Sequence, residues 1–235
     1  MATPSQNSRV VIPEAQIEEL GFASPTGYAR SKLIAERMIE NAVTSSGANA
    51  TILRIGQIIP AKSTGSQLWN PTEMIPLMVR SASTTGALPD THGSSDQCSW
   101  IDVDTLSKAI LEIGGVGEFG GKTESSQLVY NLVHPRPFSW KEDFLPALRI
   151  AGLNFETTSW TTWLEKLNDS ERDVKSNPSR KLLGFWEEGP RGDGKREVVF
   201  ETKKAEAMSE SMRTADSVVS EGYVAQLLAA WRKLW

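Results

Sequence analysis

The sequence predicts an α/β fold, because a segment typical of a buried strand lies between segments with helical periodicity. Residues 50–59 are rich in Thr, Ile and Leu and are bounded by turn residues, which indicates a buried strand. Apolar side chains recur at helical spacing from Leu33 to Ile39 before it, and in residues 72–83 after it. The length of 235 residues suffices for one large domain, or for a small domain with a helical appendage.

The N-terminal region is expected to hold a short apolar run and the start of the first long helix. Residues 1–9 are polar and are expected to form a loose N-terminus. The apolar run of residues 10–12 is stopped by Pro13. A Ser or Thr within residues 24–27 can cap the helix that follows, and residues 45–47 end that helix.

The second half of the chain is expected to continue with helices and short strands. Trp100–Asp104 opens a helix for which Asp104 is a suitable N-cap. Ser139 and Glu142 form a capping box at the start of another helix, which Gly152 ends. The last helix carries a broad apolar stripe and must pack on another element. Short strands are expected at residues 127–133, 155–158 and 197–202, and further helices at residues 161–167 and 180–187.

Residues 115–120 match the dinucleotide-binding pattern G-x-G-x-x-G letter for letter. Binding of a pyrophosphate requires this loop to follow a strand and to precede a helix. Here the loop follows a predicted helix and precedes a predicted strand. We therefore interpret it as a flexible connection.

Composition argues against several classes of function. The net charge of −4 gives no basic patch for nucleic acid, and no run of 18 apolar residues predicts a membrane span. Cys98 is the one cysteine, so no internal disulfide can form, which fits a reducing, cytoplasmic compartment. His92 and His134 show no metal-ligand spacing, and we expect no metal site.

Tyr28 and Lys32 are four residues apart at the start of the first long helix, so their side chains lie on one face. A Tyr hydroxyl, whose ordinary pKa is about 10, is a poor acid or base at neutral pH, and a neighbouring ammonium favours its phenolate. Such a pair can deliver a proton to a carbonyl oxygen while a cofactor delivers hydride. An amphipathic helix with an ordinary Tyr and a solvated Lys would show the same short pattern.

Several further segments, taken in order, make a family resemblance specific. They are GYARSKLIAE (27–36), LRIGQI (53–58), LWNPTEMIP (68–76), GALPD (86–90), WIDVD (100–104) and WRKLW (231–235). With these segments the chain resembles the C-terminal half of the thioester reductase domain, an extended short-chain dehydrogenase found in carboxylic acid reductases and in fungal synthetase-like reductases. The resemblance covers residues 10–235 and implies a partial Rossmann-like fold with a helix-rich substrate subdomain, lacking the N-terminal nucleotide-binding strands.

The resemblance implies a reaction and a set of residues for it. In this reaction, hydride would pass from NADPH to a carrier-bound acyl thioester, and an aldehyde would be released. The resemblance also implies a role in fungal secondary metabolism. Tyr28 would donate the proton, and Lys32 would tune Tyr28 and hold the cofactor ribose. Gly56, Gln57 and Ile58 would border the nicotinamide pocket, where a missing side chain lets a ligand approach the backbone.

Trp69 and Met74 are candidate walls of the acyl pocket. Apolar side chains at helical spacing usually face a core, so packing is the competing interpretation for both residues.

The nucleotide-binding half of such an enzyme has no visible counterpart in the sequence. One strand-helix unit needs about 30 residues, whereas 27 residues precede Tyr28 in this sequence, and Gly21 and Gly27 are the only glycines among them. An active reductase would therefore need NADP held by a half supplied elsewhere, for example by a separate nucleotide-binding chain. Its other partner would be an acyl or peptidyl carrier protein with a phosphopantetheine-bound substrate.

Two alternatives remain open at the level of sequence. The chain could be an inactive remnant that acts as a binding or scaffold protein, because strands without their sheet neighbours expose edges and apolar faces. It could also be a cofactor-free catalyst that reuses the substrate cleft, with Tyr28 as acid or base.

Overall fold

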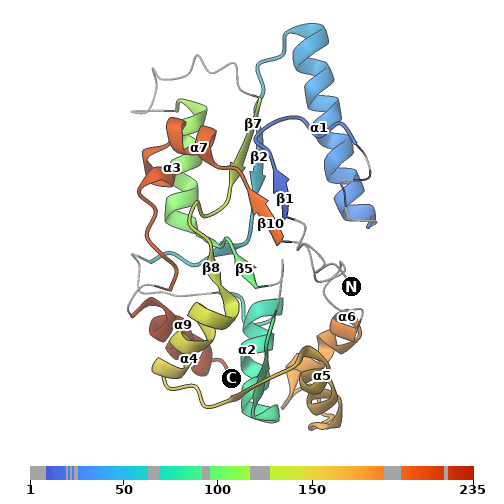
Figure 1. The fold of residues 1–235 in the computed structure, drawn as a ribbon, viewed down its shortest axis with the longest axis vertical. Helices are drawn as coiled ribbons and strands as arrows, with labels where there is room; N and C mark the ends of the chain where they lie inside the picture. Colours follow the sequence, from blue (N-terminus) through green and yellow to red (C-terminus); the bar gives the residue numbers. More distant parts are fainter. Residues whose placement is uncertain are drawn as a thin grey trace, which may run out of the picture.

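The computed structural model is an α/β protein in which strand pairs lie between helices (Figure 1), as the sequence predicts. The structure describes residues 9–19, 21, 23, 26–62, 69–91, 96–116, 128–187, 197–219 and 222–235. Residues 1–8 of the predicted loose N-terminus (residues 1–9) and residues 117–120 of the glycine-rich segment lie outside these ranges. Arg9 is the first residue of a strand and is therefore not part of a loose end.

The described strands form two-stranded pairs, and the two longest pairs are parallel. β1 (Arg9–Ile12) pairs with β10 (Glu197–Phe200), and β2 (Ile52–Ile55) pairs with β7 (Val129–Leu132). The remaining pairs are β3 (Ile58–Ile59) with β6 (Ile101–Asp102), β4 (Ala87–Pro89) with β9 (Glu156–Thr158), and the antiparallel β5 (Gln97–Cys98) with β8 (Phe138–Ser139). Every one of these pairs joins strands that are distant in the sequence, so the fold depends on long-range contacts.

Helices surround these strand pairs. The first long helix, α1 (Gly27–Ser46), stands beside β1 and β2 in Figure 1. The others are α2 (Met74–Thr85), α3 (Val103–Gly114), α4 (Leu145–Ile150), α5 (Trp160–Asp169), α6 (Leu183–Glu187), α7 (Lys203–Met208), α8 (Glu210–Arg213) and α9 (Tyr223–Arg232). A π-helical turn at Trp140–Phe144 precedes α4, and a 3₁₀ turn at Pro178–Leu182 precedes α6.

Two clusters of buried apolar side chains hold the fold together. The larger cluster joins α2, α4, α5 and α9 and is rich in tryptophan, with edge-on and tilted ring pairs among Trp69, Trp100 and Trp231. The smaller cluster packs α3, α7 and α8 against the β2–β7 pair, around Tyr130 and Leu132. Because aromatic side chains bury large areas, the larger cluster is the main source of stability in the helical part.

Helix ends follow local sequence rules, with one correction. Thr26 caps α1, its hydroxyl accepting a hydrogen bond from the Ala29 amide at 3.2 Å, and Gly47 ends the helix with φ 66°. The N-cap of α3 is Asp102 and not the predicted Asp104, since the Asp102 carboxylate accepts from the Thr105 amide at 3.0 Å. The shift arises because β6 pairs with β3 up to Asp102 and the helix starts directly after it.

Several element bounds also differ from the sequence prediction. The single strand predicted at residues 50–59 is two strands, β2 and β3, interrupted at Gly56 and Gln57. The Ser139 hydroxyl caps the turn that follows by accepting from the Glu142 amide, but the Ser139 amide donates to Asp143 and not to Glu142 as a capping box requires. The helices α7 and α8 were not predicted.

Candidate functional site

Tyr28 and Lys32 lie on one face of the first two turns of α1, as the sequence predicts. The ammonium nitrogen of Lys32 is 5.4 Å from the centroid of the Tyr28 ring, close enough for a cation–π contact. The Tyr28 side chain is 74% exposed, so its hydroxyl is open to a ligand. The catalytic roles of these two residues remain predictions.

Both residues line a groove of about 510 Å³ between α1 and β2. The groove wall on the helix side also includes Ala35, Glu36 and Ile39, which share the face of Tyr28 and Lys32. Residues 51–55 form the opposite wall. A cleft of this size can hold a small molecule.

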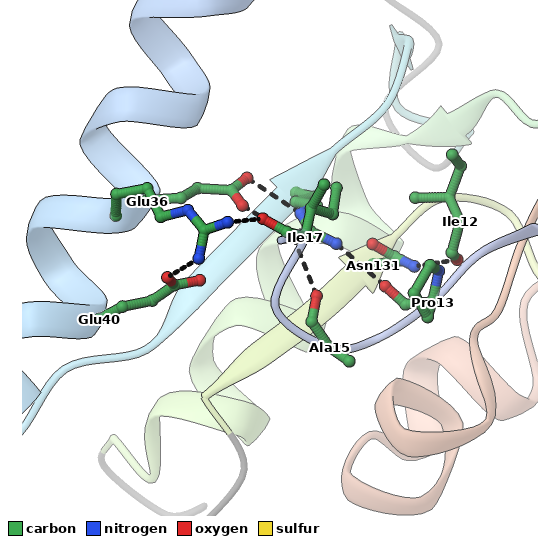
Figure 2. A network of polar contacts seen from close by, with 9 residues as sticks. Ile12, Pro13, Ala15, Ile17, Glu36, Glu40 and Asn131 are labelled. Atoms are coloured by element: carbon green, nitrogen blue, oxygen red, sulfur yellow. Dashed lines mark hydrogen bonds and ion pairs between the residues drawn. The ribbon is translucent and has the colours of Figure 1, made fainter. Parts of the chain in front are cut away.

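A network of charged and backbone groups fixes α1 to this wall. The Arg54 guanidinium on β2 donates hydrogen bonds to both carboxylate oxygens of Glu36, from Nε to Oε1 at 2.9 Å and from Nη2 to Oε2 at 2.7 Å. It also donates to the carbonyl oxygens of Pro13 at 2.9 Å and Ala15 at 3.0 Å. Figure 2 shows these groups converging on the segment that follows β1.

Arg37 makes a second connection of the same kind. It pairs with Glu40, at 3.1 Å, and donates to the carbonyl oxygen of Ile17 (Figure 2). Sequence reasoning missed both arginine contacts. The one available signal was Arg54 itself, a charged residue within the otherwise apolar strand ILRI.

A second cavity, of about 300 Å³, lies at the end of β2 and shares Arg54 and Ile55 with the groove. Gly56 and Gln57, two of the residues predicted to border the nicotinamide, line it. Ile58 is not among its lining residues. The remaining lining residues are Gln97, Ser99, Trp100, Val133, Val198 and Phe200.

Trp69 and Met74, the predicted acyl-pocket residues, line neither of these two cavities. Trp69 is 3% exposed, packs against other tryptophans and donates its ring N–H to Glu73 at 2.9 Å. Met74 is 39% exposed at the start of α2. The structure thus gives Trp69 a packing role, and a role of either residue in acyl binding stays a prediction.

Two other reactive side chains, Cys98 and His134, are buried. Burial raises the pKa of the Cys98 thiol to about 12, so the thiolate is scarce at neutral pH. Burial also lowers the pKa of His134, whose ring Nε2 lies 2.9 Å from the Asp216 carbonyl oxygen. Across the described ranges we find neither a cluster of three metal-ligating side chains nor a helix long and apolar enough to traverse a bilayer.

The groove offers a donor set that fits part of a nicotinamide cofactor. A ribose and a reacting carbonyl both need hydrogen-bond donors, and the Tyr28 hydroxyl and the Lys32 ammonium supply them side by side. Within the part of the chain that the structure describes, neither side chain forms an ion pair. These residues would hold the ribose side of the cofactor.

Comparison with known proteins supports the predicted family. Residues 4–110 match the model of an NAD-binding family described as male sterility protein. The chain is 28% identical over 235 residues to a carboxylic acid reductase of Neurospora crassa, covering 96% of this chain. It is 29% identical over 251 residues to the adenylate-forming reductase Nps11 of Serpula lacrymans, covering 97% of this chain. The matched region spans 21% of each relative.

A solved structure shows the same fold. The terminal R domain of the myxalamid PKS-NRPS biosynthetic pathway superposes with a TM-score of 0.73 at 22% identity. The match covers 96% of this chain and 54% of that chain. The resemblance predicted from the sequence is thereby confirmed, and with it the Rossmann-like fold class.

Proposed function

Because this chain is related to carboxylic acid reductases and adenylate-forming reductases, we propose that it forms the substrate-binding and proton-donating part of a thioester reductase. Its substrate is an acyl group held as a thioester on the phosphopantetheine arm of a carrier protein. Its product is an aldehyde, released for secondary-metabolite biosynthesis. The observation that carries the proposal is the open Tyr28 and Lys32 pair in the groove between α1 and β2.

The proposed reaction assigns one role to each member of the pair. NADPH, when bound, supplies the hydride that adds to the thioester carbonyl carbon. The Tyr28 hydroxyl gives its proton to the carbonyl oxygen, so that a hemithioacetal forms. Cleavage of the C–S bond then gives the aldehyde and the free pantetheine thiol. The Lys32 ammonium, which lies over the Tyr28 ring, would contact the ribose of the bound cofactor.

The β2 edge favours a nucleotide-binding unit beside this part. β2 pairs with β7 and with no other strand of the described ranges, and the groove lies along its other flank. The solved R domain is nearly twice as long as the part that this chain covers. We propose that the NADP-binding unit is a further polypeptide segment and that the pair becomes active when that segment is present.

The proposal is tested by joining the chain to such a segment. The 235-residue protein, and a version extended by the upstream coding sequence, are titrated with NADPH while tryptophan fluorescence is followed. NADPH oxidation and aldehyde formation are then measured with an acyl pantetheine thioester. We expect the extended protein to turn over, and Tyr28→Phe to lower kcat by about 10²- to 10⁴-fold, the range for loss of a general acid.

A matched control separates chemistry from folding. Because Tyr28 is largely exposed, Tyr28→Phe should keep the melting temperature of the parent. An extended protein that binds NADPH and reduces the thioester equally well with Phe at position 28 would contradict the proposal. Lack of NADPH binding by both versions would favour the binding or scaffold alternative.

A further inference from the structure

We propose that Arg54 is a positioning residue for the Tyr28 and Lys32 pair. By holding the carboxylate of Glu36, Arg54 keeps that carboxylate away from Lys32 and leaves the ammonium free to lie over the Tyr28 ring. This inference rests on the proposed function, because it explains how the proton-donating pair is kept in a usable state.

Three residues of the groove are regularly spaced along α1. Tyr28, Lys32 and Glu36 follow one another at intervals of four residues, share one helix face and line the same groove. Lys32 therefore has a possible partner on each side, the ring of Tyr28 one turn before it and the carboxylate of Glu36 one turn after it. Opposite charges four residues apart on a helix attract each other.

Arg54 and Lys32 compete for the Glu36 carboxylate. Arg54 meets both of its oxygens through two parallel N–H contacts, and both side chains are largely buried, at 13% and 16% exposure. A bidentate guanidinium contact is stronger and more directional than the contact of a lysine ammonium. Arg54 is itself fixed by the carbonyl oxygens of Pro13 and Ala15. Glu36 is thereby held toward β2.

Lys32 lies over Tyr28 and is not paired with Glu36. No ion pair of Lys32 is present among the residues that the structure describes, and its nitrogen lies 5.4 Å from the Tyr28 ring centroid. Loss of Arg54 would leave a largely buried carboxylate without its cation, and Lys32, one turn before Glu36 on the same helix face, is a cation that can replace it. The ammonium would then move from Tyr28 toward Glu36 and would be less available to the phenol and to a ribose.

Nuclear magnetic resonance tests this competition without cofactor or substrate. The Lys32 ε-methylene protons lie near the Tyr28 ring and should show a ring-current shift, identified by its loss in Tyr28→Leu. We expect Arg54→Gln to move this signal most of the way to the Tyr28→Leu value. The double variant Arg54→Gln with Glu36→Gln should restore the parent signal, because the competing charge is gone.

Two controls distinguish this role from general support of the fold. Arg37→Gln removes the neighbouring ion pair with Glu40 and the contact with Ile17, but leaves Glu36 held, so the Lys32 signal should not move. Glu36→Gln alone should not move it either. If Arg54→Gln does not fold, Arg54→Lys must move the signal in the same direction by a smaller amount.

The inference is wrong if a folded Arg54 variant leaves the Lys32 signal at its parent position, or if removal of Glu36 does not restore it. Failure of thioester reduction with the expected resonance shifts would reject the proposed function and keep the positioning role. In an extended reductase, Arg54→Gln should shift the pH profile of kcat, and the double variant should return it to the parent profile.

Discussion

Val133 occupies the space that a side chain at position 56 would need. A Cβ placed on Gly56 would lie 2.7 Å from Cγ1 of Val133, closer than real Cβ contacts come. Val133 is buried directly after β7, and Gly56 directly follows β2 and donates to the Leu132 carbonyl oxygen at 3.3 Å. Close packing against Val133 therefore explains why a glycine stands at position 56, in addition to its predicted place at the nicotinamide pocket.

Gly56→Ala should consequently destabilise the protein. The added methyl group must displace a buried, branched side chain that has little freedom to turn away, which typically costs about 1–3 kcal/mol of unfolding free energy. Urea denaturation measures this loss. Val133→Ala makes room for the methyl group, so the double variant should lose less than the sum of the two single losses. Additive losses would show that the two positions do not clash.

Glu14→Gln should loosen the N-terminal strand. The Glu14 carboxylate is 1% exposed and accepts hydrogen bonds from the backbone amides of Asn131, Lys204 and Ala205, which tie the segment after β1 to β7 and α7. A glutamine side chain has one oxygen and cannot accept all three bonds. Its own N–H groups would face backbone N–H groups, which should lower the unfolding free energy by about 2–3 kcal/mol. Chemical denaturation of this variant is compared with Glu18→Gln, an exposed neighbour that should change little.

Stability should fall in mild acid because of His134. Its pKa is lowered from the ordinary value of 6.5 mainly by burial, with the charges of Arg136 and Lys62 acting in the same direction. The folded protein therefore resists a proton that the unfolded chain accepts. The contribution of His134 to stability is complete above about pH 6.5 and decreases as the pH falls below that value.

Urea denaturation at pH values from about 5 to 8 checks this expectation, because the midpoint concentration of urea should fall on the acid side. His134→Gln should flatten the acid side of the curve, and it should lower stability at high pH because the ring contacts the Asp216 carbonyl and the Arg136 amide. His92 is the only other histidine, so His92→Gln serves as the control and should keep the slope. An unchanged acid slope in His134→Gln would place the proton uptake elsewhere.

Local features of the fold were predictable from the sequence because they depend on neighbouring residues. Thr26 caps α1, and Gly47 and Gly152 end helices with positive φ, as their residue types indicate. The contact between Tyr28 and Lys32 was predictable for the same reason, since four residues on a helix bring two side chains together.

The features that hold the candidate site in place were not predictable, because they join distant residues. β1 pairs with β10 across most of the chain, and Arg54 reaches Glu36 from another element. Hydrophobic periodicity carries no information about such pairs. Likewise, the pairing of β3 with β6 decides that Asp102 caps α3, and a helical pattern cannot distinguish it from Asp104.

Experiments can tell whether Trp69 and Met74 serve packing or substrate binding. Trp69 meets Trp100 and Trp231 with ring centroids 5.3 and 5.6 Å apart, so Trp69→Leu should lower the unfolding free energy by about 2–4 kcal/mol. Met74 is partly exposed, so Met74→Ala should cost at most about 1 kcal/mol.

KM values for acyl thioesters, measured in an extended, active reductase, test the predicted acyl pocket. If Met74 walls the acyl pocket, Met74→Ala should raise KM for a long-chain acyl thioester and leave KM for a short-chain one unchanged, because only the longer chain reaches the missing side chain. Val116→Ala, an exposed apolar residue after α3, is the control and should change neither value. Equal KM values for parent and Met74→Ala with both chain lengths would remove Met74 from the pocket and leave it as a surface residue of α2.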